Sequence, residues 1–138
     1  MASCYLLDTN ILSDLLRNPS GEVAHKIASL SAEEQGLLST SVIVACELRF
    51  GAAKKRSTLL KARVRQLLDN VIVLALEPEV DEYYGRLRTE LEEKGMPIGA
   101  NDMLIAAHAL SIDAVLVSDN IREFRRIKEL RVENWLRA

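Results

Sequence analysis

The stretch CYLLDTNILSDLL, residues 4–16, decides the fold of this chain. The apolar run at residues 3–7 (SCYLL) predicts a short buried strand, and residues 11–17 predict a short helix capped by Asn10. Asp8 lies between the two and therefore follows the strand directly. Because ligands of an open α/β sheet bind beyond the carboxyl ends of its strands, Asp8 is a candidate functional residue. The alternative is that Asp8 only caps the helix that follows.

The rest of the chain repeats this alternation of strand-like and helix-like segments. An apolar stripe at helical spacing predicts a long helix from Pro78 to about Lys94, with Gly95 at its end. Strands that alternate with helices predict a single α/β domain with a mostly parallel central sheet flanked by helices. The further expected strands are residues 36–39, 71–76, 114–117 and 131–134, and the further expected helices are residues 22–30, 42–50, 57–69, 101–110 and 121–126.

The composition limits the class of protein. A chain of 138 residues, of which 49% are hydrophobic, can bury one core. Its formal net charge of −2 argues against a nucleic-acid coat protein but not against an enzyme with a local basic rim. Cys4 and Cys46 lie in apolar runs and are expected as buried, reduced thiols, which fits a cytoplasmic protein. No segment resembles a signal peptide or a membrane span, so no membrane partner is expected.

Glu47 stands in an unusually apolar run, SVIVACELRFG at residues 41–51. On a helix it shares a face with Ile43 and Phe50, which predicts that it points toward the core. A carboxylate there is costly unless it is paired or bound to a metal ion. The alternative is a boundary glutamate paired with Arg49 or Lys54.

Two further acidic positions lie at the start of a helix and at the end of a strand. Asp102 begins the Ala-rich stretch NDMLIAAHAL, where Ile105 and Ala106 share its inward face. Asp119 and Asn120 directly follow the apolar run AVLV. The alternatives are an aspartate that favours the helix dipole at 102, and an ordinary Asp/Asn turn at 119–120.

These carboxylates are expected to meet in one cleft. Crowded carboxylates raise each other's pKa, and a divalent cation relieves their repulsion. Mg²⁺ and Mn²⁺ prefer such oxygen ligands and promote phosphodiester hydrolysis. The chain has no Ser-His-Asp order and no Gly-rich phosphate loop that would indicate another chemistry. His25 and His108 are isolated, and neither is expected to act as a base.

Four stretches of the chain resemble the PIN-domain ribonucleases, specifically the VapC toxins of bacterial toxin–antitoxin pairs. They span nearly the whole chain in the order typical of that family, and the four together are fairly specific. They are LLDTNILSDLL at 6–16, STSVIVACELRFGA at 39–52, GANDMLIAAHAL at 99–110, and VLVSDNIREF at 115–124 with the closing LRVENW at 130–135.

The resemblance implies a single α/β/α PIN domain over residues 1–138 that cleaves RNA with Mg²⁺ or Mn²⁺. A particular tRNA is a reasonable expectation for the substrate. The resemblance also implies a cognate antitoxin that blocks the site, and a homodimer. Asp8, Glu47 and Asp102 match the three principal acidic residues of the family, and we expect Asp8 and Asp102 to hold the metal ion.

The fourth catalytic position departs from the family pattern. Ser118 takes the place of the family's threonine, Asn120 takes the place of its acidic residue, and Asp119 lies one position earlier. Either Asp119 or Asn120 is therefore expected to complete the catalytic set. Asn10 and Ser118 are expected to support it.

Two basic stretches are candidates for contact with RNA phosphates. The second follows residues 118–120 directly and is the better candidate, with Arg122, Arg125 and Arg126 as the expected contacts. The first is at least as well explained as a solvated helix face. The first comprises Lys54, Lys55, Arg56, Lys61, Arg63 and Arg65; the second comprises Arg122, Arg125, Arg126, Lys128 and Arg131, diluted by Glu123 and Glu129.

Two other functions remain open from the residues alone. A phosphatase could use Asp8 as a nucleophile, but such enzymes usually carry a second acid two residues later, where this chain has Asn10. A non-catalytic PIN-like module could bind a protein or RNA without cleaving it, because the fourth position is imperfect.

Overall fold

The computed structural model describes residues 4–137, so Ser3, where the first expected strand begins, lies outside the described residues. Strands and helices alternate along the chain as the sequence predicts. The elements are β1 (Tyr5–Leu7), α1 (Thr9–Arg17), α2 (Glu22–Ser29), α3 (Ala32–Gln35), β2 (Leu38–Ser41), α4 (Val42–Lys54), α5 (Thr58–Asp69), β3 (Ile72–Leu74), α6 (Val80–Glu93), α7 (Ala100–Ser111), β4 (Val115–Val117), α8 (Ile121–Phe124) and β5 (Val132–Glu133).

The strands form one five-stranded sheet in the order β3-β2-β1-β4-β5, and every pairing is parallel. The predicted α/β fold with a parallel central sheet is therefore confirmed. Strand β1 is central and pairs with β2 on one side and β4 on the other. The carboxyl ends of these three strands lead into α1, α4 and α8, so the residues that begin these helices lie along one edge of the sheet.

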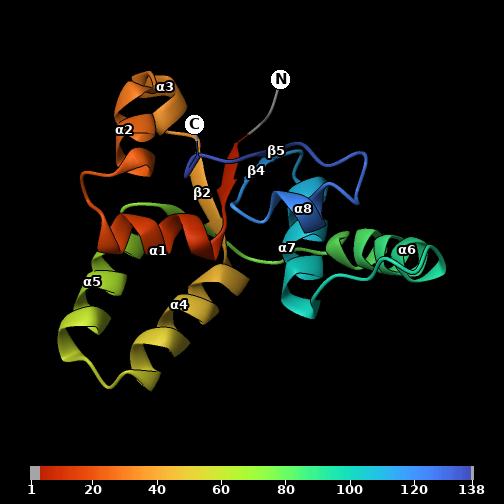
Figure 1. Cartoon of the computed structure of the whole chain (residues 1–138), viewed down its shortest axis with the longest axis horizontal. Coiled ribbons are helices and arrows are strands. Elements are labelled where there is room, and N and C mark those ends of the chain that lie inside the picture. Colours follow the sequence, from red (N-terminus) through yellow and green to blue (C-terminus); the bar gives the residue numbers. More distant parts are fainter. Residues whose placement is uncertain (1–3, 138) are drawn as a thin grey trace.

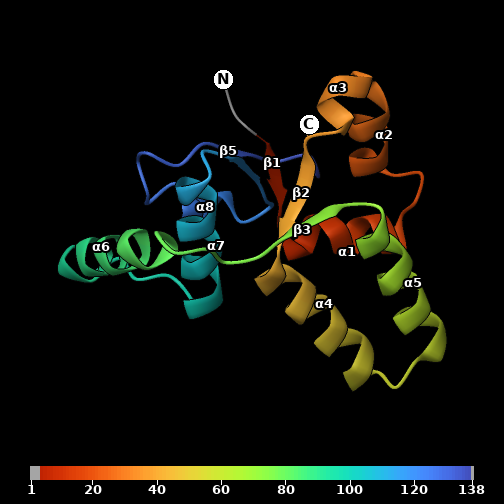
Figure 2. The same cartoon turned by 180° about the vertical axis from the view of Figure 1, so that it is seen from behind.

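Helices cover the sheet in two groups. Figure 1 shows α6 and α7 on one side of the strands and α1, α4 and α5 on the other, and Figure 2 shows the same arrangement from behind. The core between them is aliphatic and includes Leu6, Ile11, Ile105 and Leu116, none of which is exposed to solvent. Cys4 is partly buried against this core. No helix within residues 4–137 is long and apolar enough to cross a membrane.

Several element boundaries differ from the expected ones for local reasons. Helix α1 begins at Thr9, two residues earlier than expected, because Asp8 rather than Asn10 caps it. Helix α4 continues through Gly51 to Lys54. A helical glycine costs only about 1 kcal/mol, and the packing of α4 against α5 outweighs it. Pro78 lies before α6 rather than in its first turn, and the four-residue helix α3 was not expected.

Helix α4 turns a different face to the core from the one that the sequence indicated. Leu48 and Ala52 are buried, whereas Phe50 is 67% exposed and Glu47 is half-buried. The prediction of a core-facing stripe through Glu47 and Phe50 is therefore wrong: Glu47 lies on the flank of the helix. The expected burial of Cys46 is wrong for the same reason, since its side chain lies on the exposed face.

Candidate active site

Asp8 lies at the carboxyl end of the central strand and is almost completely buried. One carboxylate oxygen, Oδ1, accepts a hydrogen bond from the backbone N–H of Thr9 at 2.8 Å. The other, Oδ2, accepts from Ser118 Oγ at 2.7 Å and from Asn10 Nδ2 at 3.4 Å. Burial raises the pKa of Asp8, and these hydrogen bonds oppose part of the rise. Asp8 therefore caps α1, which was the alternative to a functional role, and it is also a buried carboxylate at the end of a strand.

Asn10 and Ser118 join the ends of β1 and β4 behind Asp8. Asn10 Oδ1 accepts from the backbone N–H of Asp119 at 3.0 Å, and Ser118 Oγ accepts from the backbone N–H of Asn120 at 3.0 Å. Both positions were predicted to support the site, and the structure places both side chains against Asp8. Their hydrogen bonds set the direction in which the chain leaves β4.

Glu47 reaches the same edge of the sheet from the flank of α4. Its Oε1 accepts a hydrogen bond from Thr9 Oγ1 at 3.0 Å. No salt bridge joins Glu47 to Arg49 or Lys54 in the described part of the chain, so the paired boundary glutamate is not what the structure contains. Thr9 donates its hydroxyl hydrogen bond to Glu47 and its backbone N–H to Asp8, so it holds the two carboxylates side by side.

Asp102 lies in the first turn of α7, where it faces the other carboxylates. Its Oδ2 accepts a hydrogen bond from Asn120 Nδ2 at 3.1 Å, and the same amide donates to Glu123 Oε2 at 3.2 Å. Partial burial, followed by the negative charges of Asp8, Glu123 and Glu47, raises the pKa of Asp102 to about 6. The structure thus brings Asp8, Glu47 and Asp102 together, as the sequence predicts, and adds a fourth carboxylate.

Asp119 points away from this cluster. Its Oδ1 accepts hydrogen bonds from Asn134 Nδ2 and Arg137 Nε, both at 2.9 Å, and these bonds lower its pKa. Asp119 therefore fastens the C-terminal segment, and its carboxylate is turned from Asp102. Of the two candidates for the fourth position, only Asn120 has its side chain within reach of another site residue.

Residues 5–130 match the family model of the PIN domain. The chain belongs to the PIN-domain family. It is 37% identical to ribonuclease VapC2 of Rickettsia felis over 132 residues, which cover 95% of this chain and 97% of that protein. It is 31% identical to the tRNA(fMet)-specific endonuclease VapC of Shigella flexneri over the same shares of both chains. Among solved structures, VapBC-1 from nontypeable Haemophilus influenzae is similar with a TM-score of 0.85 and 35% identity, covering 96% of this chain and 98% of that one.

Two residues near the acidic cluster of this PIN domain were missed from the sequence. From the sequence alone, Glu123 is named only as a charge that dilutes a basic stretch, and Thr9 is not singled out. Glu123 lies three residues after Asn120 at the start of α8, so helical spacing places both on one face. That spacing is the signal that could have found it. Thr9 carried no comparable signal, because its contact with Glu47 joins residues that are 38 positions apart.

The carboxylates of this PIN domain lie near one another but do not form a closed cage. Within residues 4–137, no set of three or more His, Cys, Asp and Glu side chains is arranged to hold a metal ion by itself. Mg²⁺ does not need such a cage, since it commonly uses one or two carboxylates and keeps several waters. Burial, followed by the negative charges of Asp8, Glu123 and Glu47, raises the pKa of Asp102, so negative charge is crowded around this residue. The donor set therefore fits a hard dication held by oxygen.

The basic rim expected after β4 is only partly free. Arg126 Nη1 donates a hydrogen bond to the backbone carbonyl of Pro97 at 2.8 Å and so holds the loop that precedes α7. Arg122 and Arg125 are exposed. Contact of these arginines with RNA stays a prediction, and charge reversal at Arg126 would disturb the loop before Asp102 as well.

Proposed function

We propose that this PIN domain is a Mg²⁺-dependent endoribonuclease, with Mn²⁺ as an alternative ion, and the toxin of a toxin–antitoxin pair. The observation that carries the proposal is the convergence of Asp8, Glu47, Asp102 and Glu123 at one place, where burial and then the charges of the other three raise the pKa of Asp102. Four carboxylates from different parts of the chain repel one another at one edge of the sheet. Such a cluster is costly in a protein unless a cation shares it.

In this proposal Asp8 and Asp102 would hold the dication, and Glu47, Asn120 and Glu123 would support these two ligands. The ion would supply Lewis-acid stabilisation of the charge that develops on the phosphodiester. Glu47 is suited to accept a proton from the attacking water, because Thr9 holds its half-buried carboxylate at the edge of the sheet beside Asp8. Asn120 orients Asp102 without adding charge.

Asp8 is poorly placed to be a phosphoryl-accepting nucleophile, as the phosphatase alternative requires. Both of its oxygens accept hydrogen bonds, from Thr9 on one side and from Ser118 and Asn10 on the other, and its side chain is almost fully buried. The place of the second acid that such a phosphatase uses is taken by Asn10, whose amide joins Ser118 and the backbone of Asp119 and cannot act as a general acid, while Oδ1 of Asp8 keeps a lone pair for a cation. The geometry therefore favours a carboxylate that orients and binds over one that attacks.

The relatives support the biological part of the proposal. This chain is similar over nearly its whole length to a ribonuclease VapC2 and to a tRNA(fMet)-specific endonuclease VapC. A solved structure that is similar to it is that of VapBC-1. We propose that this chain likewise cleaves RNA, with tRNA as the first candidate, acts in the cytoplasm, forms a homodimer, and is inhibited by a cognate antitoxin.

The test is cleavage mapping on total bacterial RNA by the purified full chain, with Mg²⁺, with Mn²⁺ and with EDTA. Asp8→Asn and Asp102→Asn are expected to reduce cleavage at least 100-fold while circular dichroism shows an intact fold. Asp69→Asn, at the exposed end of α5, removes the same kind of charge far from the cluster and should cleave like the wild type. Cleavage by both site variants at the wild-type rate, or no metal-stimulated cleavage of any RNA, would reject the proposal.

A further inference from the structure

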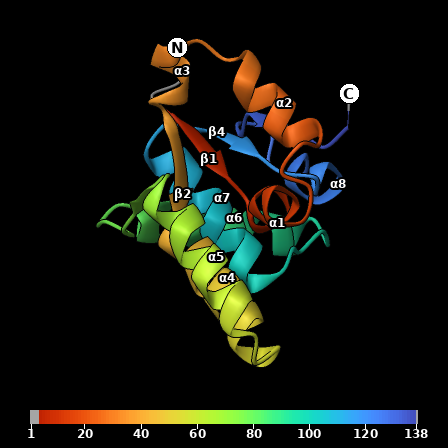
Figure 3. The same ribbon diagram turned by 90° about the vertical axis from the view of Figure 1, so that its left-hand side faces the viewer.

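The hairpin formed by α4 and α5 is strongly basic in a chain whose net charge is negative. Seven of the 18 Lys and Arg residues lie between Arg49 and Arg65, and residues 48–68 contain no Asp or Glu. Figures 1 and 3 show this hairpin extending away from the sheet. Helix α4 leaves the carboxyl end of β2 and carries Glu47, so the basic hairpin starts at the acidic cluster.

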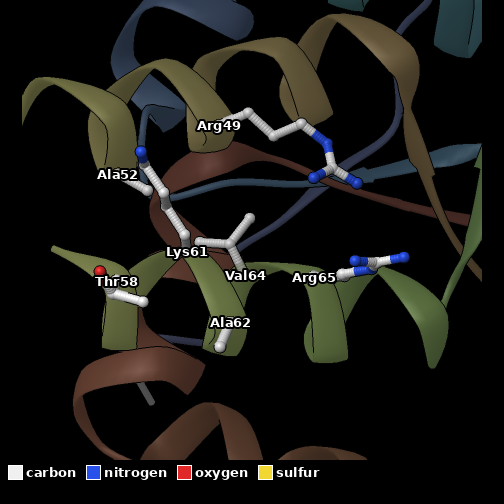
Figure 4. A pocket seen from close by; sticks show the side chains of 7 residues that line it. All are labelled: Arg49, Ala52, Thr58, Lys61, Ala62, Val64 and Arg65. Atoms are coloured by element: carbon white, nitrogen blue, oxygen red, sulfur yellow. The ribbon is translucent and has the colours of Figure 1, made fainter. Parts of the chain in front are cut away.

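The hairpin contains a hollow of about 510 Å³ between its two helices. Figure 4 shows Arg49 extending from α4 and Arg65 from α5 toward the same end of the hollow, while Lys61 reaches toward α4 at the other end. The buried side chains of Ala52 and Val64 form an apolar floor. The hollow is lined by Arg49, Ala52, Thr58, Lys61, Ala62, Val64 and Arg65, with no acidic residue among them.

The three cations of the hollow have no carboxylate partner in the described part of the chain. Salt bridges within residues 4–137 engage other arginines, including Arg86 with Glu129 and Arg131 with Asp113, both at 2.7 Å. The fold therefore uses Arg126 and Arg131 of the basic stretch after β4 in its own contacts, whereas the salt bridges of residues 4–137 use none of the three cations of the hollow. Like charges that face one hollow without a counter-ion favour an anion there.

The start of α5 adds to this field. Thr58 is the first residue of the 12-residue helix, and no acidic side chain lies in its first turn. Its hydroxyl and the positive end of the helix dipole therefore border the hollow together with Lys61. A phosphate group matches this set of donors, because it accepts several charge-assisted hydrogen bonds at once.

A second, smaller groove borders the acidic cluster and lies on the other side of the wall that Ala52 and Val64 form. It has a volume of about 270 Å³, begins at Thr9 and Glu47, and carries Arg17 and Lys55 on its rim. Ala52 and Val64 line both the groove and the hollow, so the two share a wall. A polyanion that enters the acidic site can follow these basic residues around the hairpin, which a single small anion cannot.

We propose that the hollow of Arg49, Lys61 and Arg65 binds a backbone phosphate of the RNA substrate, away from the phosphodiester that is cleaved. This inference rests on the proposed function for the identity of the polyanion. The hollow contributes affinity and position on the RNA, and the acidic cluster contributes the chemistry. Loss of the hollow therefore raises KM and leaves kcat at saturating RNA unchanged.

The test measures binding of fluorescein-labelled, unfractionated bacterial tRNA to the full chain in EDTA, where cleavage does not interfere. Arg49→Gln/Arg65→Gln is expected to raise Kd about tenfold at 0.1 M salt. It should also make the negative slope of log association constant against log salt shallower by about one to two. The matched control is Lys54→Gln/Arg63→Gln, which removes the same charge from the same hairpin outside the hollow and should change Kd less than threefold. Arg49→Lys/Arg65→Lys keeps the charge and should restore most of the affinity, which separates binding from misfolding.

Equal losses in the hollow variant and in the control would overturn the proposal, since the effect would then be diffuse charge. Unchanged tRNA affinity in the hollow variant would also overturn it, and a simultaneous loss of antitoxin binding would assign the hollow to a protein partner. Cleavage with Mg²⁺ is scored separately. If the hollow binds tRNA as expected but the wild type cleaves no RNA, the proposed function fails while the binding site stands.

Discussion

The side-chain amide of Asn120 lies 3.1 Å from Oδ2 of Asp102 and donates a hydrogen bond to it. The same amide donates to Glu123 at 3.2 Å, so an uncharged residue separates two carboxylates. This hydrogen bond lowers the pKa of Asp102, against the rise caused by burial and by the neighbouring negative charges. Asn120 therefore moderates the repulsion in the cluster even though it adds no negative charge itself.

Replacing Asn120 by aspartate should make the metal-free protein less stable. The Asn120→Asp variant loses two N–H donors and places a third carboxylate between Asp102 and Glu123. We expect the free energy of unfolding in EDTA at pH 7.5 to fall by about 1–3 kcal/mol, and 10 mM Mg²⁺ to restore most of it. Urea denaturation measures both values. Asn70→Asp, at the exposed C-cap of α5, is the control and should not respond to Mg²⁺.

The raised pKa of Asp102 predicts how stability depends on pH without metal. A folded-state pKa of about 6 lies above the unfolded value, so the folded protein binds the proton more tightly. The stability from this group is complete below pH 4 and is lost as the pH rises through about 6. A shift of this size corresponds to roughly 3 kcal/mol, and partial solvent exposure reduces it to about 1–2 kcal/mol.

Asp102→Asn should remove that dependence. In EDTA, we expect the variant to be more stable than the wild type at pH 7.5 and to lose this advantage at pH 4.5, as measured by urea denaturation across the pH range. Saturating Mg²⁺ should reduce the difference at pH 7.5 by stabilising only the wild type. Parallel pH profiles for the two proteins would show that Asp102 ionises in the folded state as it does in the unfolded state.

Glu123 and Asp119 offer a paired comparison four residues apart. Glu123 contacts the amide of Asn120 and contributes to the raised pKa of Asp102, whereas Asp119 bonds to Asn134 and Arg137. We expect Glu123→Gln to lower kcat/KM for RNA cleavage at least tenfold, and Asp119→Asn to change it less than threefold. Asp119→Asn should instead lower stability by about 1 kcal/mol, because it weakens a charge-assisted contact with the C-terminal segment. The reverse order of the two cleavage effects would contradict the geometry.

The convergence of Asp8 and Asp102 could be predicted because it depends on features that the sequence carries directly. An aspartate that directly follows an apolar strand in a parallel sheet must lie at its carboxyl edge. Asp102 lies in the first turn of a helix whose inward residues Ile105 and Ala106 are fully buried, as their spacing indicates. The parallel sheet itself follows from the alternation of strands and helices.

The choice between Asp119 and Asn120 could not be predicted, because it depends on distant partners. Asp119 is drawn aside by Asn134 and Arg137, which lie 15 and 18 residues further along the chain. Its backbone N–H is held by Asn10, which is 109 residues away. Periodicity around residues 118–120 contains none of this information.

The face of α4 was misjudged for a related reason. Apolar residues surround that helix almost evenly in sequence, so spacing alone does not select the buried side. The packing of α4 against α1, α5 and α7 makes the choice and leaves Phe50 exposed. Glu47 therefore reaches the site from the flank of the helix, where Thr9 meets it.

The hydrogen bond from Thr9 to Glu47 can be removed almost without a change of shape. Thr9→Val keeps the branched side chain and the backbone N–H that caps onto Asp8, but it leaves Glu47 Oε1 without its donor. We expect kcat for RNA cleavage to fall about tenfold with KM unchanged, because a hydrogen bond of this kind contributes about 1–1.5 kcal/mol to the position of the carboxylate. Thr9→Ser restores the hydroxyl and should recover most of the rate. Steady-state kinetics on a defined RNA measures the split. A wild-type kcat in the valine variant, or equal losses in the valine and serine variants, would contradict a role for the Thr9 hydroxyl in positioning Glu47.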